Sequence, residues 1–228
     1  MSVARTCLAI TAAVVLYGAY VAAQNPRQPS PSGTAAAQVG GKFVDGRSMI
    51  SQFTDPKTRV FFVTRGPIYQ GGKWIEITYG RPLKRGRDLW GSGAEYGQQL
   101  YAGAPVWRAG ANVSTRINTE MPLVINGKTI PIGEYSLFID LKPNNWTLIV
   151  STWATQNESF DPNNKTALWG AYNYTNEKDL VRAPMKLEKL PHSLEQLTWS
   201  FADMTDTGGT LAIMWDTAMA SVPFRIVM

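Results

Sequence analysis

The chain has 228 residues, among them 8 Trp, 9 Tyr, 8 Phe, 14 Pro and 20 Gly, which is enough for one sizeable core and many turns. Its formal net charge of +5 is spread thinly along the sequence, which argues against nucleic acid as a partner. The single Cys, Cys7, lies in an apolar leader. The rest of the chain therefore lacks a disulfide, a zinc-thiolate site and a thiol nucleophile.

The first 23 residues predict export from the cytoplasm. Arg5 precedes an uncharged run from Cys7 to Ala23 that ends in small residues before Gln24. This pattern fits both a signal peptide cleaved before Gln24 and a single transmembrane anchor, and both alternatives stay open. Arg5 predicts an N-in, C-out orientation across the membrane. If the segment is retained, the residues expected to contact the lipid bilayer are Leu8, Val14, Val15, Leu16, Tyr17 and Tyr20.

Residues 24–57 are expected to form a flexible tether and lead-in segment. From Gln24 to about Val39 the sequence is rich in Pro, Ser, Gly and Ala and has no hydrophobic period. Such a segment would hold the folded domain, expected over residues 58–228, away from the membrane.

Short β-branched and aromatic runs, separated by turn residues, predict strands in the remainder of the chain. These runs are Arg59–Thr64, Lys73–Tyr79, Pro122–Ile125, Glu134–Ile139, Trp146–Ser151, Leu197–Ala202, Thr210–Trp215 and Ala220–Val227. In the last run Pro223 favours a sheet edge or a bulge. Asn126-Gly127 and Lys142–Asn145 indicate hairpin turns. Only Gly93–Leu100 and Ser193–Gln196 suggest helix, so we expect an all-β, mainly antiparallel single domain, a β-sandwich or jelly-roll-like fold.

Four motifs occur in order in the central part of the chain, between residues 86 and 150. They are Gly86–Gly91 (GRDLWG), Trp107–Asn112 (WRAGAN), Gly133–Phe138 (GEYSLF) and the Trp-bearing run Trp146–Val150. In this order they resemble the bacterial family catalogued as domain of unknown function 2911. The resemblance implies a secreted β-rich protein, but it supplies no catalytic residues because the family has no assigned activity. The chain departs from the family pattern at Ile132, where an alanine is common, and in a longer segment over residues 97–105.

The block from Arg81 to Asn112 supplies the candidate binding residues. Trp107 and Arg108 adjoin residues with very small side chains, so that another backbone or a ligand can approach closely. Several arginines of the block could converge on an anion. In the alternative interpretation, Arg108 bonds loop carbonyls or pairs with Glu134 or Asp140. The residues proposed for a ligand or partner are Arg85, Arg87, Trp90, Trp107, Arg108 and Asn112.

Four tryptophans are expected in the core rather than on a sugar-binding surface, because large aromatic side chains dominate cores. They are Trp107, Trp146, Trp169 and Trp215.

The sequence offers little for catalysis. His192 is the only His, it lies in a turn-like stretch, and no G-x-S-x-G elbow is present. One His and no Cys outside the leader exclude the common zinc and copper sites, so we expect no metal and no cofactor. A carboxylate pair remains possible, because five acidic residues lie in or near predicted strands: Glu76, Asp88, Glu95, Glu134 and Asp140.

Three functions are compatible with these features. The preferred one is a non-catalytic, membrane-tethered accessory subunit on the periplasmic side of a larger membrane protein complex, whether respiratory, photosynthetic or of the envelope. The first alternative is a soluble periplasmic module that binds a carbohydrate or a small anion through exposed Trp and the arginine block. The second is a carboxylate-dependent hydrolase. Nucleic acid is not expected as a partner in any of them.

Overall fold

The computed structural model describes residues 30–47 and 65–227. The expected leader, with all of its candidate anchor residues, and the predicted strand Arg59–Thr64 lie outside the described residues. Among the residues that are described, no helix is both long and apolar enough to cross a membrane.

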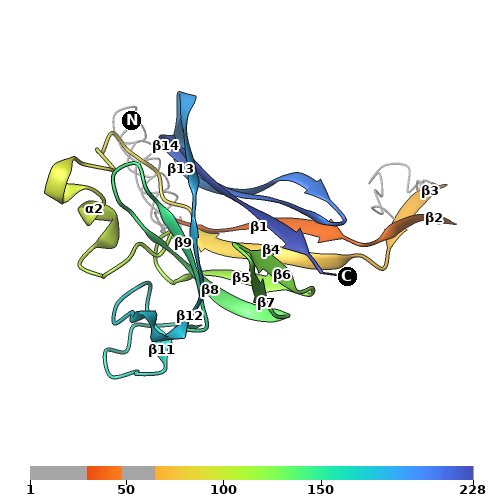
Figure 1. The fold of residues 1–228 in the computed structure, drawn as a ribbon, viewed down its shortest axis with the longest axis horizontal. Helices are drawn as coiled ribbons and strands as arrows, with labels where there is room; N and C mark the ends of the chain where they lie inside the picture. Colours follow the sequence, from red (N-terminus) through yellow and green to blue (C-terminus); the bar gives the residue numbers. More distant parts are fainter. Residues whose placement is uncertain (1–29, 48–64, 228) are drawn as a thin grey trace, which may run out of the picture.

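Two antiparallel sheets form the body of the protein (Figure 1). The first contains, in spatial order, β1 (Ser32–Val39), β4 (Lys73–Gly80), β5 (Thr115–Thr119), β8 (Gly133–Asp140), β9 (Thr147–Ser151) and β12 (Asp179–Pro184). The second contains β13 (Lys186–Thr205), β14 (Gly208–Ile226), β6 (Leu123–Ile125) and β7 (Lys128–Ile130). The prediction of a mainly antiparallel all-β domain is confirmed.

Five shorter elements pack on this body: η1 (Gly93–Glu95), α2 (Gln98–Tyr101), η2 (Asn176–Lys178) and the parallel pair of β10 (Ala154–Thr155) with β11 (Ala167–Leu168). Two further strands, β2 (Lys42–Arg47) and β3 (Arg65–Gln70), pair only with each other in the described part of the chain.

The main core lies between the two sheets because their strands alternate buried and outward residues. On β4, Ile75 and Ile77 are fully buried, whereas Thr78 points to the other face and is partly exposed. Leu211 and Ile213 of β14 belong to the same buried cluster. Burial of such side chains removes apolar area from water and is the main force that holds the sheets together.

A second, smaller core lies against the outer face of the first sheet. Phe138 of β8 and Ile149 of β9 are fully buried there beneath residues from the connection between β9 and β12, including Trp153 and Leu168. Both faces of β8 are therefore covered, which explains its uninterrupted buried run from Tyr135 to Ile139. The cover lies over β8 and β9, and the neighbouring outer face at β4 and β5 keeps partly exposed side chains.

Most predicted strands and both predicted turns are confirmed. Asn126 and Gly127, at φ of 49° and 71°, join β6 to β7, and Asn144 at φ of 58° lies in the turn between β8 and β9. Ala220–Val227 does not start a new strand, because β14 runs on through it. Pro223 lies between the last register pair with β13, at Ser221, and the first with β6, at Phe224. Its missing N–H is therefore tolerated.

Two predictions of secondary structure are wrong. Ser193–Gln196 is not helical and lies in β13, at a place where the register with β14 shifts between Lys189 and Thr198. This bulged region has turn-like residues, which explains the false helical signal. The flexible segment expected over 24–57 contains β1 and β2 in its described part, because its small residues pair with β4 and β3. The β domain therefore begins before residue 58, at Ser32.

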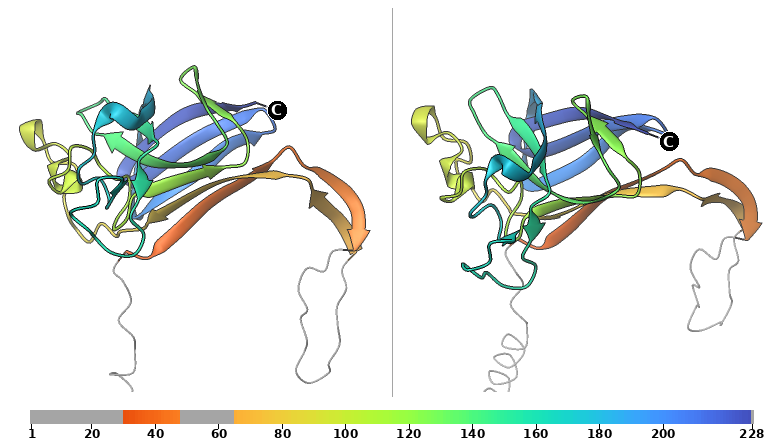
Figure 2. Two further views of the ribbon diagram at one scale, coloured as in Figure 1. Left: turned by 90° about the horizontal axis from the view of Figure 1, so that it is seen from below. Right: turned by 60° about the horizontal axis from the view of Figure 1, so that its bottom comes forward.

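The strands β1–β2 and β3–β4 form one long two-stranded ribbon. The register that pairs Ser32 with Gly80 continues without a shift to the pair of Arg47 with Arg65. At about 3.3 Å per residue, such a strand would span about 50 Å if it were straight. The part made by β2 and β3, called the arm below, extends beyond the sandwich, and the ribbon arches so that both of its ends point to one side of the molecule (Figure 2).

Paired glycines form the bend between the body and the arm. Gly40 and Gly71 lie on opposite strands and have φ of 69° and 75°, a conformation that glycine adopts without steric cost. Asp206 in the β13–β14 turn accepts a hydrogen bond from the Gly40 N–H at 2.9 Å. Tyr69 of the arm accepts another from the Gly41 N–H at 2.8 Å. The bend is thus tied both to the body and to the arm.

Candidate functional site

Trp107 and Trp90 lie in a cluster of four tryptophans at one end of the main core. Trp107 is 1% exposed and stacks on Trp215, with ring centroids 6.2 Å apart. Trp90 and Trp146 meet it edge to face, each at 6.4 Å. Offset or edge-to-face contacts at this spacing are favourable beyond the burial of area. The expectation that Trp107, Trp146 and Trp215 belong to the core is confirmed.

The small residues after Trp107 allow a close approach of backbone, as the sequence indicated. Gly80, at the end of β4, packs directly on the carbonyl group of Ala111, so that a Cβ at Gly80 would overlap that oxygen. A Cβ at Gly110 would lie 2.6 Å from the Thr115 hydroxyl oxygen. The neighbouring strand, rather than open space, therefore occupies the room that these glycines provide.

Arg108 and Asn112 hold this loop together and attach Ser30, which precedes β1, to it. The Arg108 guanidinium donates to the Asn112 carbonyl at 2.6 Å and lies over the Tyr172 ring, 5.5 Å from its centroid. Asn112, at φ of 65°, donates through its side-chain amide to the Ser30 carbonyl at 3.0 Å. Arg108 thus bonds a loop carbonyl, as in the alternative interpretation.

Arg85 and Arg87 lie in a different place from Arg108. They line a cavity of about 350 Å³ together with Ser30, Pro82 and Leu83, and Arg108 is not among its lining residues. The Arg87 guanidinium donates to the carbonyls of Lys84 and Leu83 at 2.9 and 2.6 Å. The structure therefore does not gather the arginines of the block in one cavity. Two of the N–H donors of Arg87 are used in hydrogen bonds to carbonyls of its own loop.

An ion pair fastens the Arg85–Arg87 loop to the second sheet. Lys84 Nζ and Asp216 Oδ1 are 2.6 Å apart, and the Ser193 hydroxyl donates to the same oxygen at 2.6 Å. Burial alone would raise the pKa of the Asp216 carboxyl, but the hydrogen bonds from Lys84 and Ser193 outweigh it, and the pKa lies below its ordinary value of 3.8. The sequence gives no direct signal for this pair, whose members are far apart in the chain.

The lowered pKa of Asp216 predicts an acid-sensitive contribution to stability. A carboxyl with a lower pKa in the folded than in the unfolded state stabilises the fold above the unfolded value, here 3.8, and this contribution is lost as the pH falls through the folded value. Asp216→Asn should therefore lower the free energy of unfolding at pH 7, and the deficit should shrink below pH 4. Urea unfolding at a series of pH values measures it. The exposed Asp45→Asn is the control, and an equal deficit at pH 3 and pH 7 would contradict the assignment.

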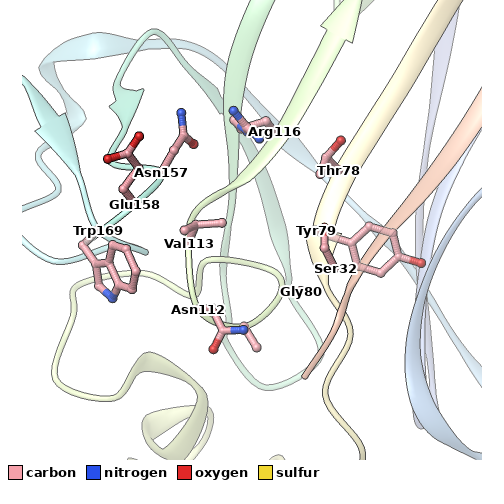
Figure 3. A pocket seen from close by; sticks show the side chains of 11 residues that line it. Ser32, Thr78, Tyr79, Gly80, Asn112, Val113, Arg116, Asn157, Glu158 and Trp169 are labelled. Atoms are coloured by element: carbon pink, nitrogen blue, oxygen red, sulfur yellow. The ribbon is translucent and has the colours of Figure 1, made fainter. Parts of the chain in front are cut away.

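A polar cavity of about 380 Å³ lies on the uncovered part of the first sheet's outer face (Figure 3). Thr78 of β4 and Arg116 of β5 form its floor, and they are direct cross-strand neighbours. Its walls come from the 107–113 loop and from the connection between β9 and β12. The wall residues are Asn112, Val113, Asn157, Glu158 and Trp169, with Ser32, Tyr79, Gly80 and Ala111 completing the lining.

Trp169 departs from its expected place. It is partly exposed and lines this cavity instead of lying in the core. Among the residues proposed from sequence, the cavity contains only Asn112; Arg116, Asn157 and Glu158 were missed. Their convergence depends on the register of β4 with β5 and on the path of a long connection, neither of which leaves a local motif in the sequence.

Two of the candidate carboxylates, Asp140 and Glu134, lie beside basic side chains. Asp140 lies 3.1 Å from Arg182 and 3.7 Å from Lys142, while Glu134 lies 3.6 Å from Arg116. Within residues 30–47 and 65–227, no group of three or more His, Cys, Asp or Glu is placed to hold a metal ion.

Burial, and then the proximity of Asp140, raise the pKa of Tyr101 to about 12, although a hydrogen bond with Leu141 opposes the shift.

The arm carries exposed aromatic surface. Phe43 is 71% exposed and meets Tyr69, its cross-strand partner, edge to face at 5.2 Å. Sequence reasoning missed the arm, although a signal was present: Gly40-Gly41-Lys42-Phe43 and Gly71-Gly72-Lys73-Trp74 repeat one pattern on the two strands of the ribbon. Paired glycines opposite each other mark its bend.

The fold and its contacts define a two-sheet β protein with a projecting ribbon and a polar surface cavity. The family described as "Protein of unknown function (DUF2911)" matches residues 67–224, and the chain belongs to this family. The match begins within β3 and ends within β14, so β1 and β2 lie before it. No curated protein and no solved structure matches the chain.

Proposed function

We propose that the protein is a non-catalytic accessory subunit that docks through its arm on a larger membrane protein complex at the periplasmic face of the bacterial inner membrane. The observation that carries the proposal is the arm itself, a two-stranded ribbon that leaves the sandwich and exposes Phe43 beside Tyr69.

The arm has the properties of a surface that gains a partner. A ribbon of two strands is marginally stable in water by itself, because it has no third strand or covering layer to bury its side chains. Exposed aromatic side chains are enriched in the central part of interfaces, where they bury large area at low cost in conformational entropy. Docking would bury the Phe43–Tyr69 pair and stabilise the ribbon.

The end of the ribbon at Ser32 lies on the same side of the molecule as the arm (Figure 2). Asn112 donates to the Ser30 carbonyl, and Arg81 N–H donates to the Pro31 carbonyl at 2.9 Å, so this end of the ribbon is fixed to the body. The arching ribbon directs this end and the arm to one side of the molecule (Figure 2). The apolar leader, if retained, and the arm would then approach the membrane complex together.

Co-isolation from native membranes tests the proposal. With a C-terminal affinity tag and a mild detergent, we expect the full chain to migrate in a native gel with a fixed set of membrane proteins in stoichiometric amounts. Phe43→Asp should reduce the recovered partner proteins at least tenfold, because it places a charge on the surface to be buried. Intact mass of the purified chain shows whether residues 1–23 are retained.

Phe160→Asp is the matched control. Phe160 is 52% exposed, but it lies in the connection between β10 and β11, at the other end of the protein from the arm. The same loss in Phe160→Asp and Phe43→Asp would indicate a general effect of added charge rather than docking by the arm. Recovery of the unaltered chain from native membranes as a free monomer alone would overturn the proposal.

A further inference from the structure

The polar cavity combines an incompletely used cation with an open aromatic face. Arg116 comes from the middle of the first sheet, where its side chain is held beside Thr78 by the β4–β5 register. Trp169 comes from the connection between β9 and β12 and lies across the cavity from that floor (Figure 3). The volume of about 380 Å³ falls in the range of small-molecule sites.

Arg116 has donor capacity that its protein contacts do not use. Its side chain is 24% exposed, and its Nε is buried without a hydrogen-bond partner among the described residues. Within the described residues Arg116 forms one ion pair, with Glu134, whose side chain is 56% exposed. The distance between Arg116 Nη1 and Glu134 Oε1 is 3.6 Å, which is too long for a good hydrogen bond. The planar fork of guanidinium donors fits a carboxylate in a two-bond arrangement.

The remaining walls suit a ring that bears hydroxyl groups. Trp169 offers a flat apolar face, while Asn112, Asn157 and Glu158 supply amide and carboxylate groups that donate to and accept from hydroxyls. In Figure 3, Asn157 lies between Glu158 and Arg116 along one side, and Trp169 and Asn112 lie along the other. The polar groups therefore surround the space next to the aromatic face.

We infer that this cavity binds a sugar that carries a carboxylate, a hexuronate as a free acid or as a residue of a polysaccharide. The carboxylate pairs with the Arg116 guanidinium, the sugar ring lies against Trp169, and the ring hydroxyls bond Asn157, Glu158 and Asn112. No residue of the arm lines the cavity, so binding in the cavity can be measured separately from docking by the arm.

Titration of the purified full chain with D-glucuronate tests the inference. We expect calorimetry to give an affinity for D-glucuronate at least tenfold higher than that for D-glucose or acetate. D-glucose lacks the carboxylate, and acetate lacks the sugar ring. In ¹⁵N spectra the indole N–H signal of Trp169 should move and that of Trp74 should not. Tighter binding of a short oligogalacturonate than of its monomer D-galacturonate would identify a polysaccharide as the source, and equal binding a free acid.

Two variants locate the binding, and a third is the control. Trp169→Ala should weaken D-glucuronate binding at least tenfold, and Arg116→Gln should abolish the preference over D-glucose. Trp74→Ala, which changes a 45% exposed Trp outside the cavity, should leave binding unchanged. Equal affinity of the unaltered chain for D-glucuronate and D-glucose, or an unmoved Trp169 signal at saturating D-glucuronate, would overturn the inference. Both measurements, the comparison of affinities and the Trp169 indole signal, use the unaltered chain and do not depend on the folding of a variant.

Discussion

Trp107→Ala should unfold the protein at a far lower urea concentration than the unaltered chain. The side chain is 1% exposed and contacts three other tryptophans, so its removal forfeits their contacts and leaves a cavity in the main core. Substitutions of this kind cost about 3–5 kcal/mol. Since a domain is stable by about 5–15 kcal/mol, the loss is a large part of the total. Urea unfolding followed by far-UV circular dichroism measures the change.

Trp74→Ala provides the comparison, because Trp74 is 45% exposed on β4. Its loss should cost less than about 1 kcal/mol, as for most surface substitutions. The backbone hydrogen bonds between Trp107 and Ile139, at 2.9 and 2.8 Å, remain in Trp107→Ala. The difference between the two variants therefore reports the side chain. Equal unfolding midpoints for Trp107→Ala and the unaltered chain would show that Trp107 is not a core residue in solution.

The strands of the sandwich could be predicted because each buries one regular set of side chains. On β4 the alternation of Ile75 and Ile77 with outward residues is a period-two signal, and on β8 the buried run reflects cover on both faces. Asn126-Gly127 likewise identified its turn, because both residues accept the positive φ that the turn requires. These strands and this turn are determined by residues that are close together in the sequence, so a local sequence pattern is enough to predict them.

The arm and the first strand could not be predicted in the same way. β1 consists largely of small residues, SGTAAAQV, and becomes a strand because β4 supplies its hydrogen-bonding partner. Its composition by itself is that of a flexible segment, so tertiary pairing overrides the local signal. The polar cavity depends in the same way on long-range register, since Thr78 and Arg116 meet only when β4 and β5 pair.

Gly80→Ala adds one methyl group beside the Trp107–Asn112 motif. It should lower the stability of the protein more than any other addition of a methyl group there. An added Cβ would overlap the Ala111 carbonyl oxygen, and because this contact is with backbone it can be relieved only by moving the strand or the loop. Overpacking of this kind costs about 1–3 kcal/mol. Any shift of the loop also moves Asn112, which lines the polar cavity and bonds Ser30. Gly80→Ala should therefore lower the thermal midpoint and weaken ligand binding in the cavity together.

Gly33→Ala is a matched control for this change, because Gly33 is adjacent on the same ribbon and its added Cβ would meet the flexible side chain of Arg81 rather than backbone. The Arg81 side chain can move more easily than backbone, so we expect a smaller loss of stability than in Gly80→Ala. Differential scanning calorimetry of the two variants measures the contrast. If both alanines lowered the thermal midpoint equally, the close approach of β4 to Ala111 would not be the reason for glycine at position 80, and the fixed position of Asn112 at the cavity wall would need another cause.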